Sequence, residues 1–202
     1  MNYLEIYGSM RLTVTIVASI VLLKYFLYLI VAPFYTVKKE LWKRDLRKRI
    51  KKGLVESNYR PLVSIIIPSW NEEVGIITTV KSALANTYEK IEVVIVNDGS
   101  TDNSDSVIRK FKEDFDKNSK SEKKILYFSQ ERGGKGSALN MGVKKSHGEI
   151  VMTIDADSAQ RKDAIENLVK WFSDPEIDAV VGNVKVANSL TLVGLLQKLE
   201  YL

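Results

Sequence analysis

The sequence predicts an α/β protein whose mostly parallel sheet carries helices on both faces and follows one transmembrane helix. From Leu62 onward, short apolar runs alternate with segments of helical periodicity, and a 21-residue apolar stretch precedes them. Repetition of strand and helix at this spacing favours a parallel sheet covered on both sides. The hydrophobic content of 45% and the charged content of 27% suit a chain with a packed core.

Five apolar runs are predicted as strands because they lack the polar alternation of a half-exposed strand. Helical periodicity fills the segments between them, and Asn71 is expected to cap the first of these helices. The expected strands are 63–67, 91–96, 125–128, 150–154 and 179–186, and the expected helices are 72–85, 103–115, 137–145 and 161–172.

The apolar stretch from Leu12 to Ala32 is long enough to cross a bilayer, which needs about 20 residues. A signal peptide would have a shorter apolar core followed by a small-residue cleavage site, which residues 33–35 do not supply. Lys24 opposes insertion by at least ~2.5 kcal/mol, and the surrounding Val, Ile, Leu and Phe offset this cost. Residues 1–35 are therefore predicted to form a transmembrane helix.

Positive charge is concentrated beside this stretch. Residues 36–60 hold ten Lys or Arg and three Asp or Glu, whereas residues 61–202 carry a net charge of −3 and the whole chain +5. This segregation argues against a nucleic-acid partner, because proteins that bind nucleic acids usually carry their positive charge on the folded domain. It predicts a single-pass protein of the cell membrane, with a basic juxtamembrane segment (36–60) near membrane lipids and a cytoplasmic domain (61–202). A solvated linker is the alternative for residues 36–60 and gives the same orientation.

The residue types limit the chemistry. The chain has no cysteine, which excludes disulfides and thiolate metal sites. Its single histidine, His147, argues against a histidine metal site or a Ser-His-Asp triad, and we assign it no role.

Polar residues follow each of the first four predicted strands. Because the carboxyl ends of parallel strands meet at one edge of a sheet, these residues are expected to line a common cleft. The four strand ends read Pro68-Ser69-Trp70-Asn71-Glu72, Asn97-Asp98-Gly99-Ser100-Thr101-Asp102, Gln130-Glu131-Arg132-Gly133-Gly134-Lys135-Gly136 and Asp155-Ala156-Asp157.

The glycine-rich strand end fits neither common nucleotide-binding motif. A P-loop requires Ser or Thr after its lysine, but Gly136 follows Lys135, and the dinucleotide fingerprint requires glycine where Leu139 stands. The loop still offers backbone donors and a cation before a helix, as an anion site would. A mobile surface loop is the alternative.

Asp155 and Asp157 supply hard oxygen ligands that suit Mg²⁺ or Mn²⁺ better than zinc. Mg²⁺ usually binds one or two carboxylates together with substrate phosphates, so this pair predicts a nucleoside-diphosphate substrate. Lys135 is expected to share in neutralising the diphosphate. A plain strand-end turn is the alternative for the two aspartates.

These motifs together resemble those of family 2 glycosyltransferases with the GT-A (Rossmann-like) fold. The resemblance extends from Leu62 to about Ser158 through Val63–Glu72, Val96–Asp102, Gly134–Asn140 and Asp155–Ser158. Residues 181–186 and 197–201 are similar to the membrane-bound processive branch, which includes poly-N-acetylglucosamine, hyaluronan, chitin and cellulose synthases; the poly-N-acetylglucosamine type is the most similar.

The resemblance implies roles for individual residues. Asp155 and Asp157 match the DxD motif, with Asp157 as the direct metal ligand and Asp155 nearer the ribose or sugar phosphate. Asp98 would hydrogen-bond the uracil. Pro68 and Glu72 would line the nucleoside pocket, and Lys135 would lie near the uracil or the diphosphate.

The implied reaction is the inverting, metal-dependent transfer of a sugar, expected to be N-acetylglucosamine, from a UDP-sugar to a growing polysaccharide. In such enzymes a Thr-Glu-Asp type motif supplies the general base and a Gln-x-x-Arg-Trp motif follows, but neither occurs before Leu202. We therefore expect no catalytic base in this chain, which would be the donor-binding half of a longer enzyme or a truncated product.

Two other interpretations remain open. The chain could be a non-catalytic, membrane-anchored binder of nucleotide sugars, or a non-processive glycosyltransferase that adds one sugar to a lipid or protein. The sequence leaves the sugar, the linkage, the acceptor and the oligomeric state undetermined.

Overall fold

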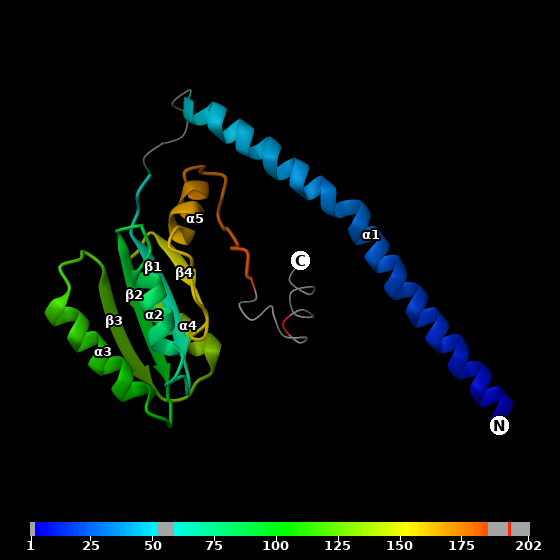
Figure 1. Ribbon diagram of the computed structural model, residues 1–202, viewed down its shortest axis with the longest axis horizontal. Helices are drawn as coiled ribbons and strands as arrows, with labels where there is room; N and C mark the ends of the chain where they lie inside the picture. The colour runs from blue at the N-terminus through cyan, green and yellow to red at the C-terminus, as the bar shows by residue number, and fades with distance from the viewer. Residues whose placement is uncertain (1–2, 52–58, 186–193, 195–202) are drawn as a thin grey trace. The chain divides into compact units, whose positions relative to one another are not determined.

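The computed structural model describes residues 3–51, 59–185 and 194 of the chain. It divides the chain into two units, Met1–Ser57 and Asn58–Leu202, which we describe separately (Figure 1). After the last predicted strand the sequence has a further apolar stripe, which lies outside the described residues; it consists of Leu192, Leu195, Leu196, Leu199 and Leu202.

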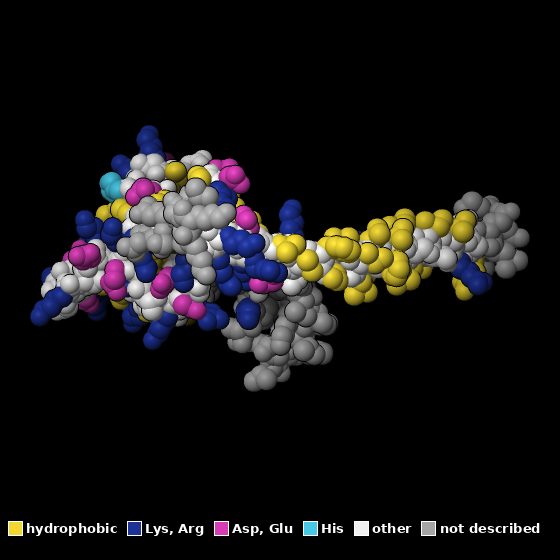
Figure 2. All heavy atoms as spheres, turned by 90° about the horizontal axis from the view of Figure 1, so that it is seen from above, with side chains coloured by type: hydrophobic (Ala, Val, Ile, Leu, Met, Phe, Trp, Pro, Cys, Tyr) yellow, Lys and Arg dark blue, Asp and Glu magenta, His cyan; other side chains and the backbone are white. Residues whose placement is uncertain are grey.

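The first unit is one helix, α1 (Tyr3–Lys51), which continues through Pro33. Within the described residues it is the one helix long and apolar enough to cross a membrane, and an 18-residue window within it has a mean hydropathy of 2.3. Its apolar side chains are exposed, as Figure 2 shows. At 1.5 Å per residue, 49 residues extend roughly 74 Å, more than twice the ~30 Å hydrocarbon core of a bilayer. Only part of α1 can therefore lie within a membrane, and the predicted basic segment begins inside the same helix.

The second unit is built on a four-stranded parallel sheet in the order β3-β2-β1-β4. Its strands are β1 (Val63–Ser69), β2 (Ile91–Asp98), β3 (Lys124–Gln130) and β4 (Ile150–Thr153). The two central strands, β1 and β2, are buried along almost their whole length, as expected for apolar runs covered on both faces.

Helices cover both faces of the sheet. The larger core lies between one face and the helices α2 (Ile76–Leu84), α3 (Ser104–Asn118) and α5 (Ala164–Phe172). On the other face, α4 (Lys135–Lys145) packs its Ala138 against Ile66, Val94 and Val96. The predicted parallel α/β architecture is confirmed.

Two local expectations are wrong. Asn71 does not cap α2: it has a φ of 53°, and the helix begins five residues later, after Gly75. Residues 179–185 form no strand in the described structure, and Val181 is 93% exposed. An apolar run becomes a strand only where another strand edge satisfies its backbone, and these residues have no such partner among those described.

Candidate functional site

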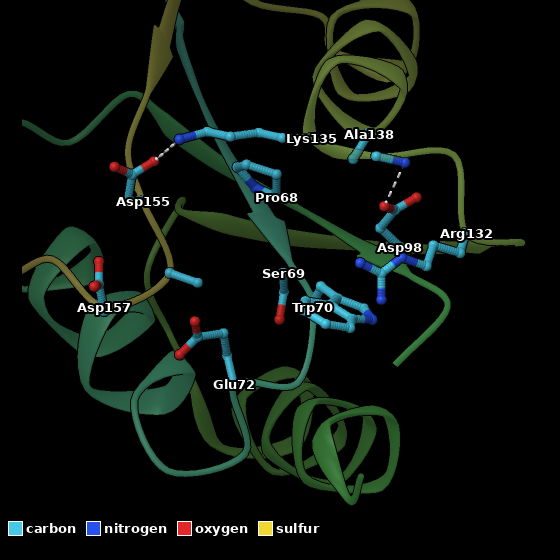
Figure 3. A pocket seen from close by; sticks show the side chains of 12 residues that line it. Pro68, Ser69, Trp70, Glu72, Asp98, Arg132, Lys135, Ala138, Asp155 and Asp157 are labelled. Atoms are coloured by element: carbon cyan, nitrogen blue, oxygen red, sulfur yellow. Dashed lines mark hydrogen bonds and ion pairs between the residues drawn. The ribbon is translucent and has the colours of Figure 1, made fainter. Parts of the chain in front are cut away.

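The four polar strand ends converge on one pocket of about 310 Å³ at the carboxyl edge of the sheet (Figure 3). Each strand or the loop after it supplies part of the lining, as predicted for parallel strands. The lining residues are Pro68, Ser69, Trp70, Glu72, Asp98, Arg132, Gly134, Lys135, Ala138, Asp155, Ala156 and Asp157.

All six residues singled out from the sequence line this pocket. Their individual roles remain predictions, because their shared position does not show what each one binds. No role was predicted for Ser69, Trp70, Arg132, Ala138 or Ala156. Four of these five lie inside the strand-end motifs of the first, third and fourth strands, so membership of the motif was the signal that could have identified them.

The Asp98 carboxylate holds the glycine-rich loop in place. It is 4% exposed and accepts hydrogen bonds from the backbone N–H groups of Gly133 and Gly134, both at 2.8 Å, and from Gln130 Nε2 at 2.7 Å. Burial would raise the pKa of Asp98, but these three donors and the nearby charge of Arg132 outweigh burial and lower that pKa. Its Oδ1 accepts two of the bonds and its Oδ2 one, which leaves Oδ2 able to accept another from a ligand.

The loops after β1 and β2 are tied together by side-chain bonds to backbone. Asn71 donates its N–H to Ser100 Oγ at 3.0 Å, and its Oδ1 accepts the Thr101 N–H at 2.8 Å. The Glu72 N–H bonds Ser104 Oγ at 2.9 Å. These bonds satisfy backbone groups that no helix satisfies, which explains why α2 begins only at Ile76. Much of the first two motifs therefore builds the pocket rather than lining it.

A tight contact sets the position of Arg132. Gly99 has a φ of +67°, and a Cβ there would lie 2.8 Å from the Arg132 backbone nitrogen, so only glycine fits. The Arg132 guanidinium then lies over the Trp70 ring, 3.5 Å from its centroid. The pair forms one wall of the pocket beside Asp98 (Figure 3).

The segment Asp155-Ala156-Asp157 is fixed from the side of α2. Thr79 Oγ1 donates a 2.6 Å hydrogen bond to the carbonyl oxygen of Ala156. A Cβ at Gly75 would lie 3.5 Å from that oxygen and 3.6 Å from Glu72 Oε2, so the β1–α2 turn packs closely on this segment. The Glu72 carboxylate therefore lies on the Asp157 side of the pocket (Figure 3).

The two aspartates differ in their partners. Asp155 forms an ion pair with Lys135 across the mouth of the pocket, and both side chains are more than half exposed. Asp157 has no hydrogen-bonding or ion-pairing partner among the described residues. Its carboxylate is therefore available to a ligand.

The described residues hold no group of three or more His, Cys, Asp or Glu side chains placed to bind a metal ion. Asp155 and Asp157 still fit Mg²⁺ or Mn²⁺, because such ions take one or two carboxylates and complete their shell with water and ligand phosphates. A cation there would depend on its phosphate ligand for firm binding.

Comparison with known proteins agrees with this geometry. Residues 64–199 match the sequence profile described as "Glycosyl transferase family 2". The chain is 36% identical over 140 residues to the poly-beta-1,6-N-acetyl-D-glucosamine synthase of Staphylococcus aureus (strain COL), a match covering 69% of this chain and 32% of that protein. It is 32% identical over 169 residues to the synthase of the same name from Staphylococcus epidermidis, covering 83% of this chain and 38% of that protein. The match thus spans about a third of the length of these curated relatives.

Solved structures show the same fold. The mannosyltransferase PcManGT from Pyrobaculum calidifontis, in complex with GDP-Man and Mn²⁺, aligns with a TM-score of 0.57 and 33% identity over 65% of this chain and 37% of that one. TarS of S. aureus aligns with a TM-score of 0.53 and 25% identity, covering 65% of this chain and 23% of that one.

Proposed function

Because the chain belongs to glycosyl transferase family 2, we propose that its pocket binds the donor of an inverting, divalent-metal-dependent transfer of sugar from a UDP-sugar to a growing polysaccharide. The observation that carries the proposal is the convergence of Asp98, Lys135, Asp155 and Asp157 on one pocket at the carboxyl edge of the sheet. A cation, two metal-type carboxylates and a buried hydrogen-bond acceptor are the groups that a nucleoside diphosphate requires.

The proposed roles are those that the resemblance to family 2 glycosyltransferases implies for each residue. Pro68 and Glu72 line the nucleoside part of the pocket, and Asp98 accepts a hydrogen bond from the base through its remaining Oδ2 position. Lys135 binds the diphosphate. Asp155 and Asp157 hold Mg²⁺ or Mn²⁺.

When bound, the metal would neutralise negative charge that develops on the leaving diphosphate. The protein orients the donor through Asp98 and the Trp70–Arg132 wall, while Lys135 adds a second positive charge at the diphosphate. All of these roles concern the donor, and we propose no general base among the described residues.

N-acetylglucosamine is the proposed sugar and a polysaccharide the proposed acceptor. The support is the identity of 36% to a poly-beta-1,6-N-acetyl-D-glucosamine synthase. We further propose that α1 anchors the chain in the cell membrane with the domain on the cytoplasmic side, because the basic residues directly follow its apolar part.

Binding of UDP to the purified chain in detergent tests the donor proposal. We expect UDP to bind with Mg²⁺ or Mn²⁺ present and at least tenfold more weakly in EDTA, about 1.4 kcal/mol. Asp157→Ala should remove this metal dependence, whereas Asp114→Ala, an exposed change on α3, should retain it. Titration calorimetry measures both. UDP binding that is equally tight with and without metal in the unchanged chain would contradict the proposal.

A GDP-sugar is the second candidate donor, because the structurally similar PcManGT was solved with GDP-Man. Competition between UDP and GDP for the same site separates the two. The UDP proposal requires UDP to displace GDP at equal concentration, and the reverse order would favour the GDP-sugar.

A further inference from the structure

The ion pair between Lys135 and Asp155 occupies part of the proposed metal site. Lys135 is the first residue of α4, and its side chain reaches across the pocket so that its ammonium contacts Asp155 Oδ1 (Figure 3). The side chains of Lys135 and Asp155 are 63% and 59% exposed. Asp157, the second proposed metal ligand, has no such partner among the residues that the structure describes.

An ammonium group and a divalent cation compete for the same carboxylate oxygens. While Lys135 remains on Asp155, the two aspartates and the lysine together carry one negative charge; when Lys135 leaves, two negative charges face the cation. A divalent ion is therefore attracted more weakly while the ion pair is intact. The phosphates of a bound nucleotide offer Lys135 another anionic partner in the same pocket.

The lysine can move without the loop moving. Asp98 holds the backbone N–H groups of Gly133 and Gly134, and the first bond of α4 joins the Ala138 N–H to the Gly134 carbonyl at 3.1 Å. Apart from the adjacent residues and the backbone of α4 itself, no atom lies within 4 Å of a Cβ built on Gly134 or Gly136, so the surroundings of the two glycines that flank Lys135 are open. Rotation about the four-carbon side chain is then enough to carry the ammonium from Asp155 into the pocket.

We propose that Lys135 is a positioning residue that couples metal binding to nucleotide binding. Without nucleotide it pairs with Asp155 and weakens metal binding; with nucleotide its ammonium moves to the diphosphate and frees Asp155 for the metal. Because such coupling is reciprocal, the metal strengthens nucleotide binding by the same factor. The inference rests on the proposed donor site and adds an order of assembly, in which the metal binds firmly only together with the nucleotide.

Binding of Mn²⁺ alone tests the inference directly. Free Mn²⁺ is measured by electron paramagnetic resonance in titrations of the full chain in detergent, without nucleotide. Lys135→Met should bind Mn²⁺ about two- to fivefold more tightly than the unchanged chain, the range expected for removing one exposed ion pair. Lys135→Arg keeps the cation and should restore weak binding. Lys144→Met, an exposed change near the other end of α4, should leave Mn²⁺ affinity unchanged.

UDP provides the second measurement. Lys135→Met should bind UDP more weakly in the presence of Mn²⁺, and the factor by which UDP strengthens Mn²⁺ binding should fall. A lysine that only binds diphosphate would weaken UDP binding but leave the affinity for Mn²⁺ alone unchanged, and this result would overturn the inference. Failure of UDP to bind the unchanged chain would instead contradict the donor proposal, while the titration with Mn²⁺ alone would still decide the role of the ion pair.

Discussion

The Asp98 carboxylate shows how one residue can serve both the fold and the site. Its three hydrogen bonds close the glycine-rich loop over the end of β2. Its low pKa is the electrostatic consequence, because donors aimed at a buried carboxylate favour the charged form more than burial disfavours it. The same bonds leave one acceptor position for a ligand, so structural and binding roles meet in a single side chain.

We expect Asp98→Asn to reduce the free energy of unfolding by about 1–3 kcal/mol at neutral pH. The NH₂ of the asparagine would face a backbone N–H whose hydrogen bond the Asp98 carboxylate accepts in the unchanged chain. The lowered pKa means that the stabilisation from Asp98 is present above its ordinary value of 3.8 and is lost as the pH falls below it. Urea unfolding followed by tryptophan fluorescence should therefore show the difference between variant and unchanged chain shrinking below about pH 4. Asp114→Asn, an exposed change on α3, is the control. A difference that is constant with pH would show that Asp98 is not charged in the folded state.

At the scale of elements, four of the five apolar runs correctly predicted strands of the sheet, and the two central strands, β1 and β2, are buried along almost their whole length. Parallel pairing then placed all the strand ends at one edge, which is why the six predicted site residues line one pocket. The start of α2 was not predictable from its own periodicity. It depends on Asn71 bonding to a loop about 30 residues further along the chain.

Two other features depend on contacts between distant segments. Glu92 is a buried carboxylate that accepts bonds from Ser64 Oγ and the His147 N–H, both at 2.5 Å, and lies 3.0 Å from His147 Nδ1. Ser64 and His147 lie 28 and 55 positions from Glu92, so no local pattern could predict a role for His147. The described part of the fifth apolar run, residues 179–185, forms no strand for the same reason, because pairing is a property of two segments and not of one.

The close contact between the loops after β2 and β3 leads to a prediction about Gly99. Gly99→Ala would force an alanine into the left-handed region of backbone conformation, which costs about 1–2 kcal/mol. Its Cβ would also lie 2.8 Å from the Arg132 backbone nitrogen. We expect it to lower the free energy of unfolding by at least that amount and to weaken UDP binding, because the loop that carries Arg132 must shift. Gly136→Ala is the matched control: it lies in α4 with no atom within 4 Å of its Cβ, so its stability should be equal or higher. Equal stability of the two variants would show that the loops are not in close contact.

At the scale of the whole molecule, charge and hydrophobicity divide the chain into parts with different surroundings. The apolar part of α1 exposes large side chains in succession, including Leu22, Leu29 and Phe34, which a water-exposed helix would not do. Its one charge in this stretch, Lys24, lies 5.5 Å from the centre of the Tyr28 ring, where a cation is partly stabilised away from water. The proposed ligand of the domain that follows is a water-soluble nucleotide. The apolar part of α1 and the domain therefore suit different surroundings, hydrocarbon and water.

This division leads to a prediction about orientation, and the absence of cysteine makes it simple to test with single reporter thiols. Ser9→Cys lies before the apolar stretch from Leu12 to Ala32, and Ser106→Cys lies on the exposed side of α3. The basic residues after the span should keep their side cytoplasmic, so a membrane-impermeant maleimide added to intact cells should label Ser9→Cys and leave Ser106→Cys unlabelled until the cells are lysed. The unchanged chain, which has no thiol, is the control for background. Labelling of Ser106→Cys but not Ser9→Cys in intact cells would reverse the orientation, and protection of both would show that α1 does not span the membrane.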